Sequence, residues 1–196
     1  LQDTDSDMYQ WSGDTLLDYI NDGQRAIVLL KPNANVTNTS VQLVAGTKQT
    51  IPTGGVSLVK VTRNMGAAGA TAGRVINFIP MEQYNYLEPT WHSQDATPIV
   101  EAYTYDEDDP THFYVVPPQP NPPHYVEMVY AATPTDIATS AAAITLNDIY
   151  VGALTNYALY RAYATETDQL SASLSEKYYN LFVTELGRKD LVEQKN

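Results

Sequence analysis

Ser57 and Lys60 have the spacing of a serine–lysine nucleophile pair, which is the clearest catalytic pattern in the chain. That chemistry places the serine at the start of a helix with the lysine one turn on. Here both residues fall in an alternating strand pattern, where residues three apart face opposite sides. The three histidines, His92, His112 and His124, lie in or beside loops or strand ends and lack a histidine four residues away. We therefore expect no catalytic site, and histidines at the surface.

Two acidic stretches are candidate cation sites. Asp3, Asp5 and Asp7 alternate as at the start of a calcium loop, but Met8 and Asp14 replace the glycine and glutamate that such a loop needs. We expect a solvated loop there and no bound metal.

The second acidic stretch is Asp106-Glu107-Asp108-Asp109. At a hairpin tip such a run could clamp a cation, but it is more typical of a solvated turn that protects an exposed sheet edge. Asp106, Asp108 and Asp109 are also candidate contacts for a basic partner surface. We expect no cofactor at either stretch.

Arg161 is the only charged residue between Ile149 and Thr165, a segment of tyrosines, alanines and leucines. A guanidinium in such a segment must be paired or must reach solvent. We expect an ion pair or a stack on tyrosine that fixes helix packing; the alternative is a contact across a subunit boundary, with Tyr157 as an aromatic anchor. The candidate ion-pair partners are Asp14, Asp18 and Asp148.

The composition excludes several classes of function. The 196 residues carry a net charge of −12, and the 11 lysines and arginines are scattered, which argues against binding phosphate backbones or anionic lipid by charge. The absence of cysteine removes disulfides, thiol catalysis and zinc–thiolate sites. No apolar run approaches the ~20 residues of a membrane span, and no signal peptide is visible. The chain begins at Leu1 rather than Met, so we expect further residues upstream.

Hydrophobic periodicity predicts three helices. The first covers Asp14–Leu30 and ends at Lys31-Pro32, and Gly23 beside its apolar face would let another helix approach closely. The other two lie within Asp148–Leu186, the first capped by Asn147 or Asp148 and the second stopped by Gly187. The expected stripe of the last helix is Leu170, Leu174, Tyr178, Leu181 and Phe182. Because residues 149–165 are apolar or aromatic on most of their surface, the rest of the chain or a neighbouring copy must cover them.

From Asn33 the period changes to alternation, which predicts strands. We expect hairpins that pair 41–44 with 49–51 and 99–105 with 112–116, and further strands over 57–65, 74–79 and 125–130. Within 57–65, Leu58 and Val61 should face opposite sides. A short helix over 81–87, a polyproline II connector over 117–123 and a linker of small residues over 131–146 complete the chain.

The segregation of strands from helices predicts an α+β fold. We expect an N-terminal helical part over 1–32 and an inserted antiparallel β domain over 33–130. A C-terminal helix pair over 131–186 should complete a bundle with the first helix, and a charged tail should occupy 187–196.

Five segments, taken in order, resemble a known family. They are LLDYINDGQRAIVLLKPNA at 16–34, SVQLVAGTKQTIP at 40–52, VTRNMG at 61–66, THFYVVPPQP at 111–120 and DIYVGALTNYALYRAYATE at 148–166. The sequence resembles the phage adaptors, head-to-tail connector proteins of tailed bacteriophages akin to the tail tubular protein A group. The resemblance covers Leu16–Leu186 and rests on the order and the amino-acid sequence of the segments, since no motif in it is catalytic.

This resemblance implies a non-enzymatic structural protein in the neck of the virion. Such adaptors form a ring, usually dodecameric, between the portal and the tail or nozzle protein, and DNA passes through the channel without specific binding. The helical part docks on the portal, which would place Arg188 and Lys189 against the portal. Asp106–Asp109 would lie near neighbouring subunits or the next tail protein. The acidic balance suits a channel wall that does not retain DNA, and tyrosine-rich helices suit subunit interfaces.

Two other classes of function remain open from the sequence. A carbohydrate- or receptor-binding tail component would use aromatic residues of the β domain as a platform, with Trp91, Tyr103, Tyr105 and Tyr114 as candidates. A hydrolase has the least support, because no nucleophile, base and orienting group come together at an interpretable spacing.

Overall fold

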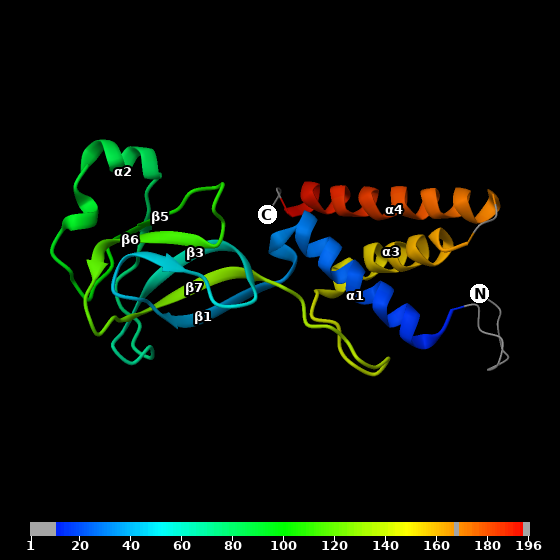
Figure 1. The fold of residues 1–196 in the computed structure, drawn as a ribbon, viewed down its shortest axis with the longest axis horizontal. Coiled ribbons are helices and arrows are strands. Elements are labelled where there is room, and N and C mark those ends of the chain that lie inside the picture. Colours follow the sequence, from blue (N-terminus) through cyan, green and yellow to red (C-terminus); the bar gives the residue numbers. More distant parts are fainter. Residues whose placement is uncertain (1–10, 167–168, 194–196) are drawn as a thin grey trace. The chain divides into compact units, whose positions relative to one another are not determined.

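The structure, a computed structural model, describes residues 11–166 and 169–193, with side chains up to position 187 (Figure 1). Asp3, Asp5, Asp7 and the side chains of Arg188 and Lys189 therefore lie outside the described residues. The chain forms two compact units, a helical unit of residues 1–34 and 134–196 and a β unit of residues 35–133. The three long helices lie in the helical unit and the strands lie in the β unit, which also holds one short helix, and this arrangement confirms the α+β class.

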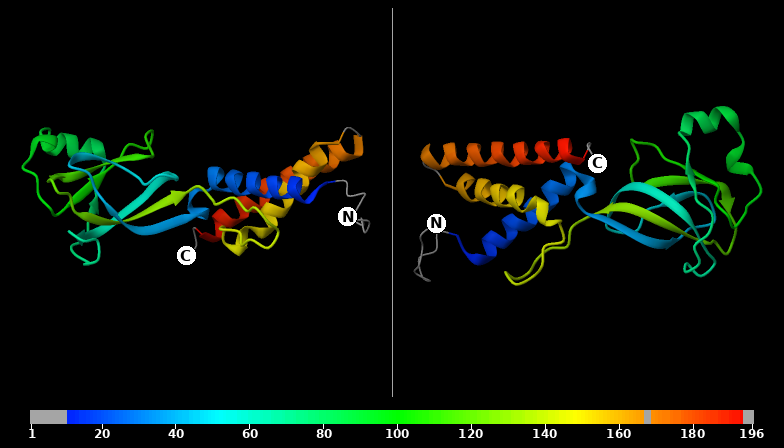
Figure 2. Two further views of the ribbon diagram at one scale, coloured as in Figure 1. Left: turned by 60° about the horizontal axis from the view of Figure 1, so that its bottom comes forward. Right: turned by 180° about the vertical axis from the view of Figure 1, so that it is seen from behind.

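Three helices build the helical unit: α1 (Gly13–Leu30), α3 (Val151–Ala164) and α4 (Gln169–Glu193). α3 is the central helix, because it contacts both α1 and α4, and α3 and α4 run side by side in all views (Figures 1 and 2). The Ser12 hydroxyl caps α1 by accepting a hydrogen bond from the Thr15 amide at 3.1 Å. The Asn147 carboxamide accepts from the Ile149 amide at 3.0 Å and starts the 3₁₀ turn η3 (Asp148–Tyr150), which leads into α3.

The last helix continues past Gly187 to Glu193, so the predicted stop is wrong, and the segment expected as a charged tail is helical up to Glu193. A glycine inside a helix costs only about 1 kcal/mol, and the residues that follow Gly187 are mostly good helix formers. The predicted apolar stripe is also wrong in part. Ser171, Ser175, Phe182 and Leu186 face the interior, while Leu170 is 70% exposed. The small serines allow α4 to approach α3 closely, and the Ser175 hydroxyl donates to the Tyr160 carbonyl at 3.3 Å.

The segment before α3 is fixed to α1 by buried amides, whereas the sequence predicted a plain linker. The Asn21 side chain donates to the Ile137 carbonyl at 3.0 Å and accepts from the Ile137 amide at 2.9 Å. The fully buried Gln24 side chain accepts from the Thr145 hydroxyl at 3.4 Å. Residues 134–146 are thus part of the helical unit.

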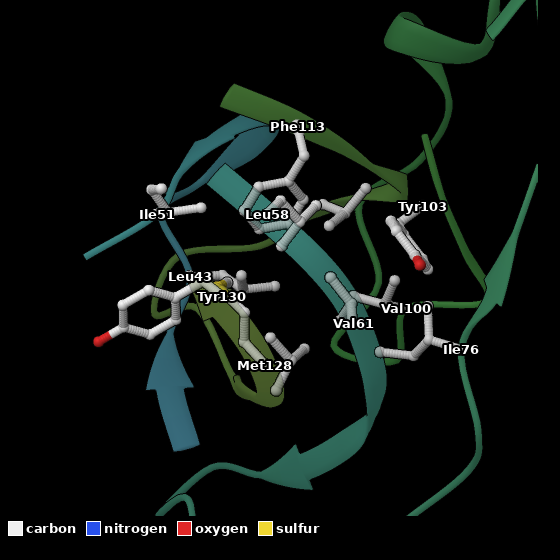
Figure 3. Packing of buried hydrophobic residues seen from close by; sticks show 12 residues of the cluster. Leu43, Ile51, Leu58, Val61, Ile76, Val100, Tyr103, Phe113, Met128 and Tyr130 are labelled. Carbon is white, nitrogen blue, oxygen red and sulfur yellow. The ribbon is translucent and has the colours of Figure 1, made fainter. Parts of the chain in front are cut away.

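Two sheets form the β unit. One has the order β1 (Val36–Gln42), β7 (Tyr125–Ala132), β3 (Gly55–Gly66), and the other β2 (Gly46–Thr50), β6 (His112–Gln119), β5 (Ala102–Thr104), β4 (Asn77–Phe78). All pairs are antiparallel except β4 with β5. Inward-facing residues from both sheets share one core, in which Leu58, Val61 and Phe113 lie together (Figure 3).

Strand β3 does not alternate as its sequence predicts. Leu58, Val61 and Asn64 lie opposite Tyr130, Met128 and Val126 of β7, so β3 advances three residues for every two of its partner. Register shifts at each step place an extra residue in β3, as in a β-bulge. Leu58 and Val61 therefore point into the same core, although strict alternation puts them on opposite faces.

The expected hairpin of 41–44 with 49–51 is absent, because β1 pairs with β7 and β2 pairs with β6 in the other sheet. The Gln49 side chain joins the two segments instead: it accepts from the Val44 amide at 2.7 Å and donates to the Val44 carbonyl at 2.9 Å. The hairpin of β5 with β6 is confirmed. However, β6 runs through Pro117 and Pro118, where a polyproline connector was expected. Proline has no backbone N–H to donate, and the register shift between β6 and β2 means that no N–H is required at these two positions.

Helix α2 (Met81–Leu87) and the 3₁₀ turn η2 (Trp91–Ser93) cover the outer face of the second sheet. Trp91 is buried against Ala102 of β5 and Val116 of β6, and its indole N–H donates to the Asn85 side chain at 2.9 Å.

Candidate functional site

Arg161 lies in a charged network between α1 and α3. Its Nη1 lies 2.9 Å from the Asp22 carboxylate, and its guanidinium stands over the Tyr19 ring at 5.3 Å. Asp22 also accepts from Arg25 at 3.1 Å, and Arg25 in turn reaches Asp136. The expected ion pair with aromatic contact is confirmed, but the partner is Asp22. Asp22 lies one helical turn beyond Asp18, at the level where α3 crosses α1.

The surroundings of Arg161 stabilise its charge. A hydrogen bond with the Tyr157 side chain is the main cause that raises the pKa of Arg161. Burial is the next largest effect and opposes the rise, and the charges of Tyr157 and Asp22 add to it. The Arg161 and Asp22 side chains are 36% and 38% exposed, so this ion pair is worth at most about 1 kcal/mol. Within the described chain Arg161 therefore has a packing role in its own subunit, and a role in a subunit contact stays a prediction.

Helix α3 is packed against α1 and α4, but these two helices do not cover it all round. Ala153, Leu154 and Ala162 are buried, whereas Ile149 is 53% and Val151 51% exposed. Tyr157 is half-buried and packs edge-on against the Phe182 ring of α4, with ring centroids 5.2 Å apart. The contacts of α1 and α4 thus leave part of this apolar helix open within the single chain.

The open side of α3 forms an apolar groove with α1, which we call the α1–α3 groove. Its volume is about 240 Å³. Its large apolar side chains are Trp11, Leu16, Ile20, Ile144, Val151, Leu154 and Leu159. Asp148 and Val151 line a second hollow that continues from one end of the groove.

Helix α4 presents a second partly apolar surface on the flank turned away from α3. Leu170, Leu174, Lys177 and Leu181 follow one another at helical spacing, and we call this row the α4 ridge. Leu170 is 70% and Leu181 39% exposed, and Lys177 and Leu181 line the same shallow hollow. Tyr179 and Val183 lie on the other flank of α4, each 46% exposed.

The acidic turn between β5 and β6 is built by hydrogen bonds within the turn. The Asp106 carboxylate accepts from the Asp108 amide at 3.0 Å, and His112 Nδ1 lies 2.8 Å from the Asp109 carboxylate. This hydrogen bond from His112 is the main cause that lowers the pKa of Asp109. Phe78 and Tyr105 border the turn with their rings 5.2 Å apart, so the surface beside the carboxylates is aromatic.

The residues that suggested catalysis are not assembled into a site. The β3 bulges bring Ser57 and Lys60 to the same face of the strand, which corrects the argument from alternation, but no hydrogen bond joins the two side chains. His92 stacks on Trp91 and lies 2.9 Å from the Thr47 hydroxyl, so it is held by packing. Among the described residues, no three His, Cys, Asp or Glu side chains lie close enough together to hold a metal ion.

The comparison with known families supports one of the classes of function that the sequence left open. A family model described as SU10 adaptor protein matches residues 1–196. The chain belongs to the SU10 adaptor family. These adaptors are phage head-to-tail adaptors, so the chain is a structural protein of the virion. No curated protein matches the sequence.

Among the described residues, the four aromatic candidates for a carbohydrate platform do not form one exposed surface. Trp91 is 1% and Tyr103 5% exposed, and both are core residues of the β unit. Tyr114 packs edge-on against Trp91, with ring centroids 5.9 Å apart. Alternation predicted that Tyr103 and Tyr105 share a face, but it could not show that this face is the inner one.

No helix in the described part of the adaptor has the length and apolar content that crossing a membrane requires.

Proposed function

We propose that this adaptor assembles into a closed ring between the portal and the tail or nozzle protein, and that the ring extends the channel through which DNA passes. Family membership supports the neck position and contacts with portal and tail proteins. A dodecamer is the copy number that the resemblance to tail tubular protein A suggests.

The observation that carries the ring is the open apolar side of α3. Val151 is more than half exposed in the single chain and lines the α1–α3 groove, and Ile149 of the preceding 3₁₀ turn is also more than half exposed. Burial of apolar surface stabilises association by about 25 cal/mol per Å² before the costs of binding are subtracted. An obligate oligomer accounts for such a surface, because its interfaces resemble a core cut in half.

The charge of the chain supports a DNA channel. A net charge of −12 per subunit repels the phosphate backbone, so DNA slides along such a wall without being retained. The Asp106–Asp109 turn and its aromatic border are the surface that we assign to a basic region of the next tail protein or of a neighbouring subunit.

Electron microscopy of the purified adaptor mixed with the portal protein of the same phage tests the proposal. We expect a second ring of density, coaxial with the portal. Portal particles without added density, at adaptor concentrations well above those of the portal, would contradict the proposal.

A further inference from the structure

We propose that the α1–α3 groove of one subunit receives the α4 ridge of a second copy of this chain. The inference rests on the proposed ring and names its subunit contact. Both surfaces belong to the helical unit, and each is apolar and open in the single chain.

The groove and the ridge lie on different helices. The groove is formed by α1 and α3, and the ridge is on the flank of α4 turned away from α3. A contact between unlike surfaces is heterologous, so each subunit keeps one free groove and one free ridge after pairing. Heterologous contacts propagate and close into a ring when the rotation between subunits allows closure. A pairing of groove with groove would instead stop at a dimer.

The charges at the two surfaces are complementary. Asp148 lies one helical turn before Val151 at the end of the groove, and its side chain is exposed. Lys177 lies one turn before Leu181 in the ridge and is likewise exposed. Lys177 is the charged residue of the ridge row and Asp148 the charged residue at the end of the groove, each about 5–6 Å from an exposed aliphatic side chain, and these two charges have opposite sign. Glu176 lines the hollow beside the ridge. Placing Leu181 against Val151 brings Lys177 within reach of Asp148.

The side chains also match in type. The groove is lined by branched aliphatic and aromatic side chains, and the ridge presents leucines at helical spacing. Leucines at this spacing can enter a groove between two helices, as in helix-in-groove recognition. The other flank of α4 carries Tyr179 and Val183, and the Tyr179 ring packs on Tyr160 of α3 in its own chain with ring centroids 5.1 Å apart, so this flank is partly occupied already.

Cross-linking through introduced cysteines tests the contact, since the chain has no cysteine of its own. Val151→Cys and Leu181→Cys proteins are mixed, with and without the portal protein, and treated with a short bis-maleimide. We expect an adaptor–adaptor cross-link in the mixture and none with either variant alone. Val183→Cys, on the other flank of α4 and 46% exposed, is the matched control and should cross-link to Val151→Cys at least tenfold less.

Several results would overturn the contact. They are cross-linking of Val151→Cys to itself, equal cross-linking to Val183→Cys, cross-linking of Val151→Cys to the portal alone, and no cross-link under either condition. If rings still form on the portal in these cases, the proposed function stands and only the contact is wrong. If no ring forms with the wild-type chain, the proposed function fails as well.

A charge exchange gives an independent readout of the same contact. Asp148→Lys and Lys177→Glu should each reduce assembly when alone. An equimolar mixture of the two should recover it, because alternating subunits pair the reversed groove of one variant with the reversed ridge of the other, and a wild-type groove with a wild-type ridge. The double variant should recover assembly, because both charges of the contact are reversed together. Failure of the double variant to assemble, with unchanged circular dichroism and unfolding temperature, would contradict the proposed pairing.

Discussion

Gly23 of α1 lies directly against Leu154 of α3, and a Cβ at position 23 would lie 2.7 Å from Leu154 Cδ1 and 3.0 Å from the Tyr157 ring. The absence of a side chain is thus what allows the two helices to approach. Gly23→Val should destabilise the helical unit by about 1–3 kcal/mol, as overpacking of a core does. Gly13→Val is the matched control, because nothing lies within 4 Å of a Cβ at that position. Urea unfolding would measure both, and equal losses of stability would show that the helices do not meet at Gly23.

Leu154 and Val151 lie one turn apart on α3 but have different surroundings, being 5% and 51% exposed. Leu154→Asp buries a carboxylate without a partner and should unfold the helical unit, a loss of more than about 3 kcal/mol. Val151→Asp should leave the unfolding temperature of the isolated chain unchanged within about 2 °C but prevent assembly on the portal. Circular dichroism and electron microscopy separate these effects. Normal assembly of Val151→Asp would remove the groove from the subunit interface.

The Arg161–Asp22 pair should contribute a small, salt-dependent coupling energy. A double-mutant cycle with Arg161→Ala and Asp22→Ala should give about 0.5–1 kcal/mol at low salt, because both side chains are partly exposed. The coupling should fall at high ionic strength, where exposed charges are screened. A coupling above about 3 kcal/mol would mean that the pair is far more buried than its exposure in the single chain indicates.

The Asp109–His112 hydrogen bond should make stability depend on pH in the acid range. Since the folded-state pKa of Asp109 lies below its ordinary value of 3.8, its contribution is complete above that value and is lost as the pH falls through the folded-state pKa. Asp109→Asn should therefore lower the unfolding temperature at pH 5–6, and the difference from wild type should shrink in more acidic solution. Asp108→Asn, which lacks a histidine partner, is the control. An Asp109 carboxyl that titrates at or above the ordinary value by NMR would contradict the contact.

The last turns of α4 are the segment that we assign to the portal. Removal of residues 188–196 should leave the circular dichroism of the helical unit nearly unchanged, because α3 packs on Ser171, Ser175 and Phe182 of α4. The truncated chain should bind the portal more weakly, which a pull-down with purified portal protein would measure. Unchanged binding would remove this segment from the portal contact.

Local sequence patterns predicted the existence of most helices and strands, because these patterns reflect interactions between residues that are close in the sequence. The apolar period of α1 and the cap at Asn147 depend on neighbouring residues, and both are found in the structure. The position of Gly23 against α3 also follows from its place beside an apolar face. Gly187 shows the limit of such signals: glycine permits a helix to end, but the residues after it decide whether the helix does end.

Long-range pairings were missed for a common reason. The bulges of β3 depend on β7, which lies some sixty positions further along the chain, and nothing within β3 indicates that three residues will match two. The partner of Arg161 depends on how α1 crosses α3, so three other aspartates were equally good candidates in sequence. The prediction of an aromatic platform was wrong because alternation shows which residues share a face of the strand, but it does not show whether that face is buried.

The mass of the adaptor in the presence of its portal tests the central claim most directly. Native mass spectrometry of the complex should show many copies of the 21.7 kDa chain bound per portal ring, in one fixed number that matches a closed ring. A portal that carries a variable number of adaptors, or an adaptor that remains a 21.7 kDa monomer beside unliganded portal, would contradict the account.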